Sequence, residues 1–150
     1  GLNERRQVET AQIFGDQHQS VAYRAGCKGA AHGEYTVTFA ARARDLLEWQ
    51  PNAARWDFEL LKIGRHVRLD VRVKAVLGRN AMENAALDEL FSRHDAPACT
   101  LLVPENFQGP SSLLVGPAGD EHRRLAGALI LRHARRFDPT EASVRVRARG

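Results

Sequence analysis

The apolar positions in the first half of the chain recur at helical spacing. From 37 to 49 they return every three or four residues, and Pro51 marks where this helix must stop. A second helix is predicted over about 53–63, where the apolar residues share one face and Gly64 ends the pattern. Together the two segments predict a helical hairpin over 35–64.

Beyond residue 64 the pattern changes to short apolar runs of the kind that form strands. Strands are predicted at 66–69, 71–77, 99–103, 112–115 and 143–148, and helices at 81–92 and 121–136. The resulting order, β-β-α-β-β-α-β, indicates an α+β fold. We expect a small mixed or antiparallel sheet with helices packed on one side, preceded by a helical segment.

The first 34 residues differ from the rest of the chain. A short helix is predicted at about 4–14, and a glycine-rich stretch with scattered histidines follows it. The chain also begins without an initiator methionine, which suits a fragment of a longer protein. We therefore interpret 1–34 as a leader or linker from an upstream domain, and 65–150 as an α+β domain of its own.

Positive charge is concentrated at the C-terminal end. The whole chain has 22 Lys and Arg against 18 Asp and Glu, a formal net charge of +4. The last thirty residues hold eight arginines and three acidic residues, a net charge of +5, so the first 120 residues carry −1. Basic residues confined to one part of a chain favour a local anion-binding face.

Arginines of the last predicted helix and the last predicted strand are candidates for that face. Four fall within roughly a third of the helix circumference: Arg124, Arg132, Arg135 and Arg136. Three alternate along the strand and share one of its sides: Arg145, Arg147 and Arg149. If helix and strand are neighbours, several guanidinium groups would contact the phosphates of one nucleic-acid strand. The alternative is that each arginine is solvated or paired with a nearby carboxylate.

A second group of cations and polar side chains occupies the middle of the chain. The candidates for RNA contact are Arg65, His66, Lys74, Arg79, Asn80, Asn84, Ser111 and Ser112. Asn80 followed by Glu83 is also the pattern of a helix N-cap with its capping-box partner. Asn84 lies one turn later, where no cap is needed, so its amide is free for a base edge or a phosphate. Turn chemistry alone explains the two serines, and His66 is more simply a neutral structural histidine.

No set of residues has the spacing that catalysis or cofactor binding requires. The chain has no Gly-x-Ser-x-Gly elbow, no phosphate-cradling glycine-rich loop and no His-Glu-x-x-His motif. Cys27, His18 and His32 are too scattered for a zinc site. Cys99 opens an apolar strand, as a buried hydrophobic residue would. We therefore expect no catalytic residue, no cofactor and no metal.

The compartment is predicted from features that the sequence lacks. Two cysteines are too few for a disulfide framework, and the chain does not begin with a secretory signal. No apolar run approaches the ~20 residues of a membrane helix. These features predict a cytoplasmic protein with no membrane partner.

Several of these segments, taken in order, resemble the NFACT-type RNA-binding domain. They are the Gly78-Arg79-Asn80 start of 78–84, the glycine and apolar strand of 109–115, the Ala-rich helix 126–135 with its basic end, and Val144-Arg145-Val146. The resemblance implies tRNA or another structured RNA as the partner. This version looks like the one at the C-terminus of bacterial proteins related to tRNA thiouridine synthases.

The upstream residues extend the resemblance. Segments at 5–7, 14–15, 25–27 and 39–66 are similar to the stretch that joins the ATP-pyrophosphatase domain to the C-terminal domain in those proteins. The chain departs from the family around Cys27, where Lys28-Gly29-Ala30 replaces Leu-Leu-Thr, and it lacks the Ser-Gly-Gly-x-Asp-Ser loop that binds ATP. The resemblance implies an RNA-binding accessory domain without activity of its own. Its parent would be an ATP-dependent tRNA sulfurtransferase with an upstream ATP-pyrophosphatase domain.

Two other interpretations stay open. One is an interaction or dimerisation domain, in which Trp49, Trp56, Phe58 and the 1–34 segment dock onto another protein or a second copy. The other is an enzyme that uses Cys27 as a sulfur carrier.

Overall fold

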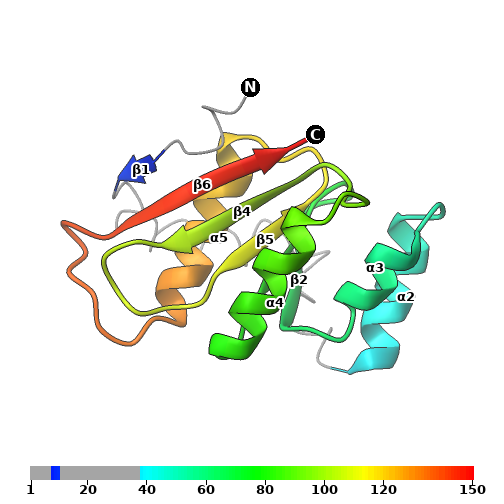
Figure 1. Ribbon diagram of the computed structural model, residues 1–150, viewed down its shortest axis with the longest axis horizontal. Coiled ribbons are helices and arrows are strands. Elements are labelled where there is room, and N and C mark those ends of the chain that lie inside the picture. The colour runs from blue at the N-terminus through cyan, green and yellow to red at the C-terminus, as the bar shows by residue number, and fades with distance from the viewer. Residues whose placement is uncertain (1–7, 11–37) are drawn as a thin grey trace.

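The computed structural model describes residues 8–10 and 38–150, which form a six-stranded sheet and four helices. The strands are β1 (Val8–Thr10), β2 (Arg65–Arg68), β3 (Lys74–Leu77), β4 (Cys99–Pro104), β5 (Ser112–Val115) and β6 (Ser143–Arg149). The helices are α2 (Phe39–Trp49), α3 (Arg55–Leu60), α4 (Ala81–Ser92) and α5 (Asp120–Arg132). The strand order is β1-β6-β4-β5-β3-β2, and each of these pairings is antiparallel (Figure 1). The predicted α+β class with a preceding helical segment is confirmed.

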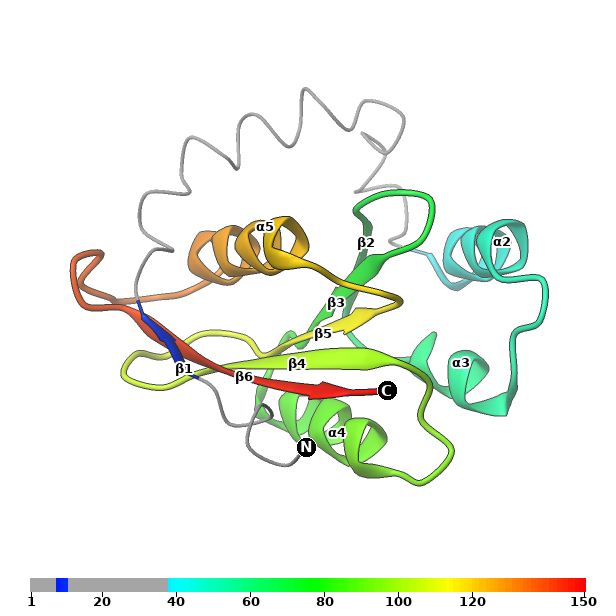
Figure 2. The same ribbon diagram turned by 90° about the horizontal axis from the view of Figure 1, so that it is seen from above.

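The helices cover both faces of the sheet (Figure 2). Leu102, Leu114 and Val146 belong to the core under α5. Leu101 and Leu113, which point the other way, belong to the core under α3 and α4. We predicted helices on one side, and the structure differs because β3 and β5 are buried along their whole length. A strand with no solvated face needs cover on both sides.

The last helix, α5, ends at Arg132, short of the predicted 121–136 helix. His133 is its C-cap, and the backbone then turns so that Arg136 forms a β-bridge with Gln108. The N–H of Arg135 also donates to the carbonyl of Gln108, at 3.2 Å. Arg135 and Arg136 therefore lie on a loop tied to the β4–β5 connection and do not continue a helical stripe.

The first strand, β1, lies inside the helix that we predicted at about 4–14. Val8–Thr10 pair with the start of β6 at the edge of the sheet. The extended form of so short a segment depends on a strand far away in the sequence, so the local pattern could not identify it. The remainder of 1–37 lies outside the described residues.

The hairpin of α2 and α3 packs against the sheet through a buried ion pair. Arg68 of β2 donates from Nε and Nη2 to the two carboxylate oxygens of Asp45 on α2, at 3.2 and 2.7 Å. The two side chains are only 5% and 6% exposed. Arg42 of α2 donates from Nε to the carbonyl of Leu61, at 2.7 Å, which joins α2 to the end of α3. The hairpin is thus held against β2 by an ion pair that is buried from water.

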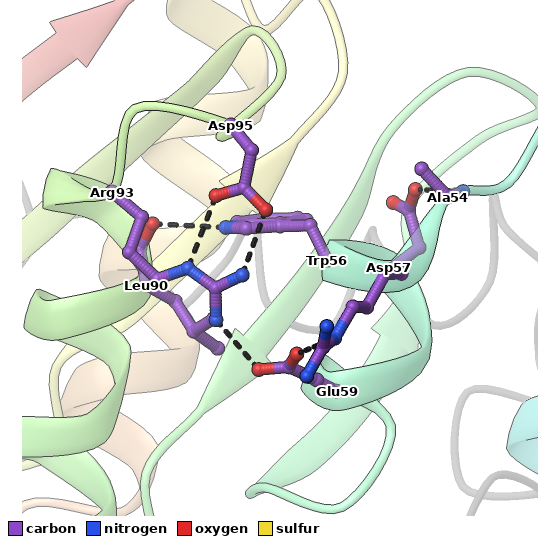
Figure 3. A network of polar contacts seen from close by, with 8 residues as sticks. Ala54, Trp56, Asp57, Glu59, Leu90, Arg93 and Asp95 are labelled. Atoms are coloured by element: carbon purple, nitrogen blue, oxygen red, sulfur yellow. Dashed lines mark hydrogen bonds and ion pairs between the residues drawn. The ribbon is translucent and has the colours of Figure 1, made fainter.

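A second network joins α3 to α4 (Figure 3). The indole Nε1 of Trp56 donates to the carbonyl of Leu90, at 2.9 Å. Beside it, the guanidinium of Arg93 bridges Asp95, at 2.7 Å, and Glu59, at 2.6 Å. These contacts fix α3 against α4. The start of α4 lies directly after the end of β3.

Candidate nucleic-acid interface

One end of the sheet collects the segments that carry the predicted cations. Arg65 at the start of β2 is paired with Leu77 at the end of β3, and Leu77 with Ser112 at the start of β5. The turn into α4 leaves β3 at this end, and the 108–111 loop enters β5 here. This loop contacts the segment that follows α5 (Figure 1). We call the arginines gathered here the basic end: Arg65, Arg79, Arg132, Arg135 and Arg136.

Glu83 on α4 links the start of β2 to Arg79. Arg79 donates from Nε and Nη2 to the Glu83 carboxylate, at 3.0 and 2.8 Å. The pKa of Glu83 is lowered to about 2, mainly by the hydrogen bond from the Arg79 side chain, with smaller contributions from the backbone N–H groups of Arg79 and Gly64. Because Gly64 immediately precedes Arg65, this ionised carboxylate holds the starts of β2 and α4 together.

His133 lies close to cations from two elements. Burial lowers the pKa of His133, and the charges of Arg65 and Arg132 lower it further. Arg65 and Arg132, far apart in the sequence, are therefore neighbours across this end of the sheet. We did not predict His133 as a site residue, although its position directly after Arg132 was a signal that could have found it.

Most of the basic end carries unneutralised charge. Arg65, Arg132, Arg135 and Arg136 are exposed, and no ion pair joins them to an acidic residue within 8–10 and 38–150. Arg79 is paired with Glu83. The arginines with acidic partners at other places on the surface include Arg55, Arg93, Arg123 and Arg145. Open guanidinium donors in one place suit the oxygens of phosphate groups.

Lys74 and His66, both predicted to contact RNA, are buried on the α2–α3 side of the sheet. Lys74 is 1% exposed, and its Nζ has no hydrogen-bond partner among the described residues. The pKa of Lys74 is lowered to about 8, mainly by burial and to a smaller extent by the charge of Arg68. Nε2 of His66 donates to the carbonyl of Ile63, at 2.9 Å, while burial lowers the pKa of this ring to about 3. Neither side chain reaches the surface of the basic end.

The predicted amides and hydroxyls are engaged within the protein. Oδ1 of Asn80 accepts from the N–H of Glu83, at 2.9 Å, so the N-cap interpretation is confirmed. Oδ1 of Asn84 accepts from the N–H of Ser111, at 3.0 Å, so its oxygen is already occupied. Ser111 and Ser112 are buried and do not present their hydroxyl groups to a ligand. These residues therefore support the backbone of the basic end and do not form its surface.

The arginines of β6 do not join the basic end. The valines of β6 face the core under α5, so alternation turns Arg145, Arg147 and Arg149 toward the α4 face. The guanidinium of Arg147 lies 4.9 Å from the centroid of the Phe91 ring. Arg149 donates to the carbonyl of Phe91, at 3.0 Å. The predicted helix stripe and strand row therefore lie on opposite faces, and the single surface proposed for them does not form.

Residues 64–150 match the family described as the NFACT protein RNA binding domain. The match spans more than half of the chain, so the protein belongs to this family and carries an RNA-binding domain. It runs from β2 through β6 and includes all five arginines of the basic end. No curated protein and no solved structure matches the chain. The domain resemblance seen in the motifs is thereby confirmed.

Two further findings concern membranes and cysteines. None of the helices in the described part of the chain is long and apolar enough to cross a membrane. Cys99 is free and buried, as predicted. Cys27, His18 and His32, considered above for sulfur or metal chemistry, lie outside the described residues.

Proposed function

We propose that this protein is a tRNA-binding accessory domain of a cytoplasmic tRNA-thiolation enzyme, and that it holds the RNA by its phosphates at the basic end. One observation carries the proposal: the arginines at 65, 132, 135 and 136 gather without an acidic partner among the described residues. Guanidinium groups stay charged at physiological pH and match the geometry of phosphate oxygens.

The width of the basic end suits a nucleic-acid backbone better than one isolated phosphate. β2, β3 and β5 are neighbours, and each step between strands is about 4.8 Å. The cations therefore spread from Arg65 at the edge strand to Arg135 and Arg136 beyond β5. Ligands with several linked phosphates gain from every contact, and each contact releases a condensed counterion.

The test is the salt dependence of tRNA binding, measured by fluorescence anisotropy. Replacing Arg132 or Arg135 with Gln should weaken binding and lower the slope of log K against log salt by about 1. Arg55→Gln is the matched control, because this exposed arginine of α3 lies outside the basic end and pairs with Glu59. Its slope should equal that of the wild type. Affinity no better than about millimolar at low salt, or equal losses for Arg55→Gln and Arg132→Gln, would overturn the proposal.

The thiolation context is supported by the resemblance of 5–66 to the connecting segment of thiouridine synthase-related proteins. On this proposal, an upstream ATP-pyrophosphatase domain activates the tRNA that the basic end holds. In the parent enzyme, Arg132→Gln should raise KM for tRNA and leave kcat unchanged, since the domain binds ground state and transition state alike. Equal affinity of the isolated chain for tRNA and for unstructured RNA of the same length would remove tRNA as the preferred ligand.

A second candidate function is supported by exposed apolar residues on the hairpin. Phe39 and Leu47 on α2 are 51% and 59% exposed, and Phe58 on α3 is 41% exposed. Phe39 and Leu47 are two helical turns apart and share a face. If this face mediates dimerisation, sedimentation velocity should show self-association that Leu47→Glu abolishes. A monomer at every concentration would exclude it.

A further inference from the structure

The two sides of the basic end are connected by the 108–111 loop. Arg79 lies at the start of α4, whereas Arg135 follows α5 on the opposite face of the sheet. The loop passes between them at the end of the sheet, immediately before β5. Whatever holds this loop therefore also sets how far apart the two arginines stand.

Asn84 holds the loop at its β5 side. Oδ1 of Asn84 accepts from the N–H of Ser111, at 3.0 Å. The carbonyl of Ser111 in turn accepts from the N–H of Gly78, at 3.1 Å. At the other side of the loop, the carbonyl of Gln108 accepts from the N–H of Arg135, at 3.2 Å. The loop is thus fastened to the β3–α4 turn through one residue and to the Arg135 segment through another.

Close packing leaves the Asn84 side chain little freedom. A Cβ added to Gly78 would lie 2.1 Å from Oδ1 of Asn84 and 3.0 Å from its backbone nitrogen. Arg79, the next residue, is held by Glu83, one position before Asn84, through its backbone N–H and its guanidinium. Asn84 therefore sits between the turn that carries Arg79 and the loop that carries the contact to Arg135.

We propose that Asn84 is a positioning residue for RNA binding, which fixes the separation of Arg79 and Arg135. This inference rests on the proposed role of the basic end. Two cations held at a set distance reach successive phosphates without a further loss of conformational freedom, and the second contact benefits from the first. The role replaces the direct RNA contact predicted for Asn84, because the oxygen of its amide is committed to Ser111.

The test is a double-mutant cycle of tRNA affinity with Arg79→Gln and Arg135→Gln, measured with Asn84 intact and again with Asn84→Ala. The two arginines should be coupled in the wild type and uncoupled in the Asn84→Ala protein. Asn84→Ala alone should weaken binding about five- to tenfold. Its salt slope should not change, because no cation is removed. Loss of a direct amide contact would weaken binding too, but it would leave the coupling intact.

Two further variants separate the positioning role from a general loss of structure. Asn84→Asp keeps an oxygen that can accept the Ser111 N–H but removes the amide donors, so the coupling should persist. Gly78→Ala pushes the Asn84 oxygen away, so the coupling should be lost.

Asn106→Ala is the matched control. Oδ1 of Asn106 accepts from the N–H of Ser143, at 3.0 Å, and Nδ2 donates to the carbonyl of Glu141, at 2.7 Å. It joins two segments in the same manner but touches neither arginine of the cycle, so affinity and coupling should stay as in the wild type.

The outcomes distinguish this inference from the proposed function. Equal coupling with and without the Asn84 side chain overturns the positioning role and leaves RNA binding at the basic end intact. Absence of wild-type binding overturns both. If circular dichroism shows that Asn84→Ala does not fold, the other two variants decide. Coupling kept in Asn84→Asp and lost in Gly78→Ala supports the role, and any other pattern overturns it.

Discussion

The ion pair between Asp45 and Arg68 should be a principal anchor of the α2–α3 hairpin, and Asp45→Asn tests this. The substitution preserves the shape of the side chain and removes its charge. Arg68 would then stay in a site where it is 5% exposed, and a neutral amide oxygen would stand where the two charged oxygens of Asp45 accept its hydrogen bonds. Lys74 and Arg42 lie in the same buried layer, and Asp57 would be the remaining carboxylate there.

The magnitude follows from the burial of both partners. Removing one member of a buried ion pair typically costs about 3–5 kcal/mol, because the other charge is left without compensation in a medium that solvates it poorly. The pair between Arg93 and Glu59 is the natural comparison, since these side chains are 31% and 33% exposed. Glu59→Gln should therefore cost much less than Asp45→Asn.

The assay is urea unfolding followed by tryptophan fluorescence and by far-ultraviolet circular dichroism. Trp49 and Trp56 both lie on the hairpin and report its detachment, whereas circular dichroism reports the whole fold. For a slope near 1.5 kcal/mol per molar, a loss of 3 kcal/mol moves the midpoint by about 2 M urea. A cost of Asp45→Asn as small as that of Glu59→Gln would refute the argument.

Three further predictions concern pH, a glycine and a thiol. Burial lowers the pKa of His66 from 6.5 to about 3. Between these two pH values the histidine is protonated in the unfolded chain and neutral in the folded chain, so the free energy of unfolding should fall as pH drops from 6.5 toward 3. His66→Gln should flatten that part of the stability profile, and an unchanged profile would contradict the assignment. Gly64→Ala should lower the free energy of unfolding by at least about 1 kcal/mol, measured by thermal unfolding. The φ of Gly64 is +75°, and a Cβ there would lie 2.4 Å from the carbonyl oxygen of Leu77. A variant more stable than the wild type would argue against the described backbone at Gly64. Burial raises the pKa of Cys99 to about 11, so in a Cys27→Ser background a disulfide reagent should react with it only as the chain unfolds, and immediate reaction would show the strand to be open.

The elements most accurately predicted are those whose signals are local. α4 and β5 have the predicted bounds, because Asn80 caps the helix within its first turn and a run of apolar residues defines the strand. The same holds for the family, whose motifs are short and occur in a constant order. Predicted candidates such as Arg65 and Arg132 proved to be exposed neighbours.

The features that were predicted wrongly share a physical cause, because each is set by contacts with residues distant in the sequence. The end of α5 is set by the bridge between Arg136 and Gln108, and the face on which the β6 arginines lie is set by the core under α5. Lys74 looks like a surface cation in the sequence and is buried because the hairpin covers its side of the sheet.

The sequence by itself therefore determined the α+β order of 65–150, the Asn80 cap and the RNA-binding family, since periodicity and motifs act over a few residues. Only the tertiary structure decided which arginines of the described residues lack an acidic partner among those residues, because ion pairs such as Arg147 with Asp88 join residues that chain order does not bring together. It also decided that Asn84 faces the 108–111 loop, since that contact exists only once α4 has packed beside β5.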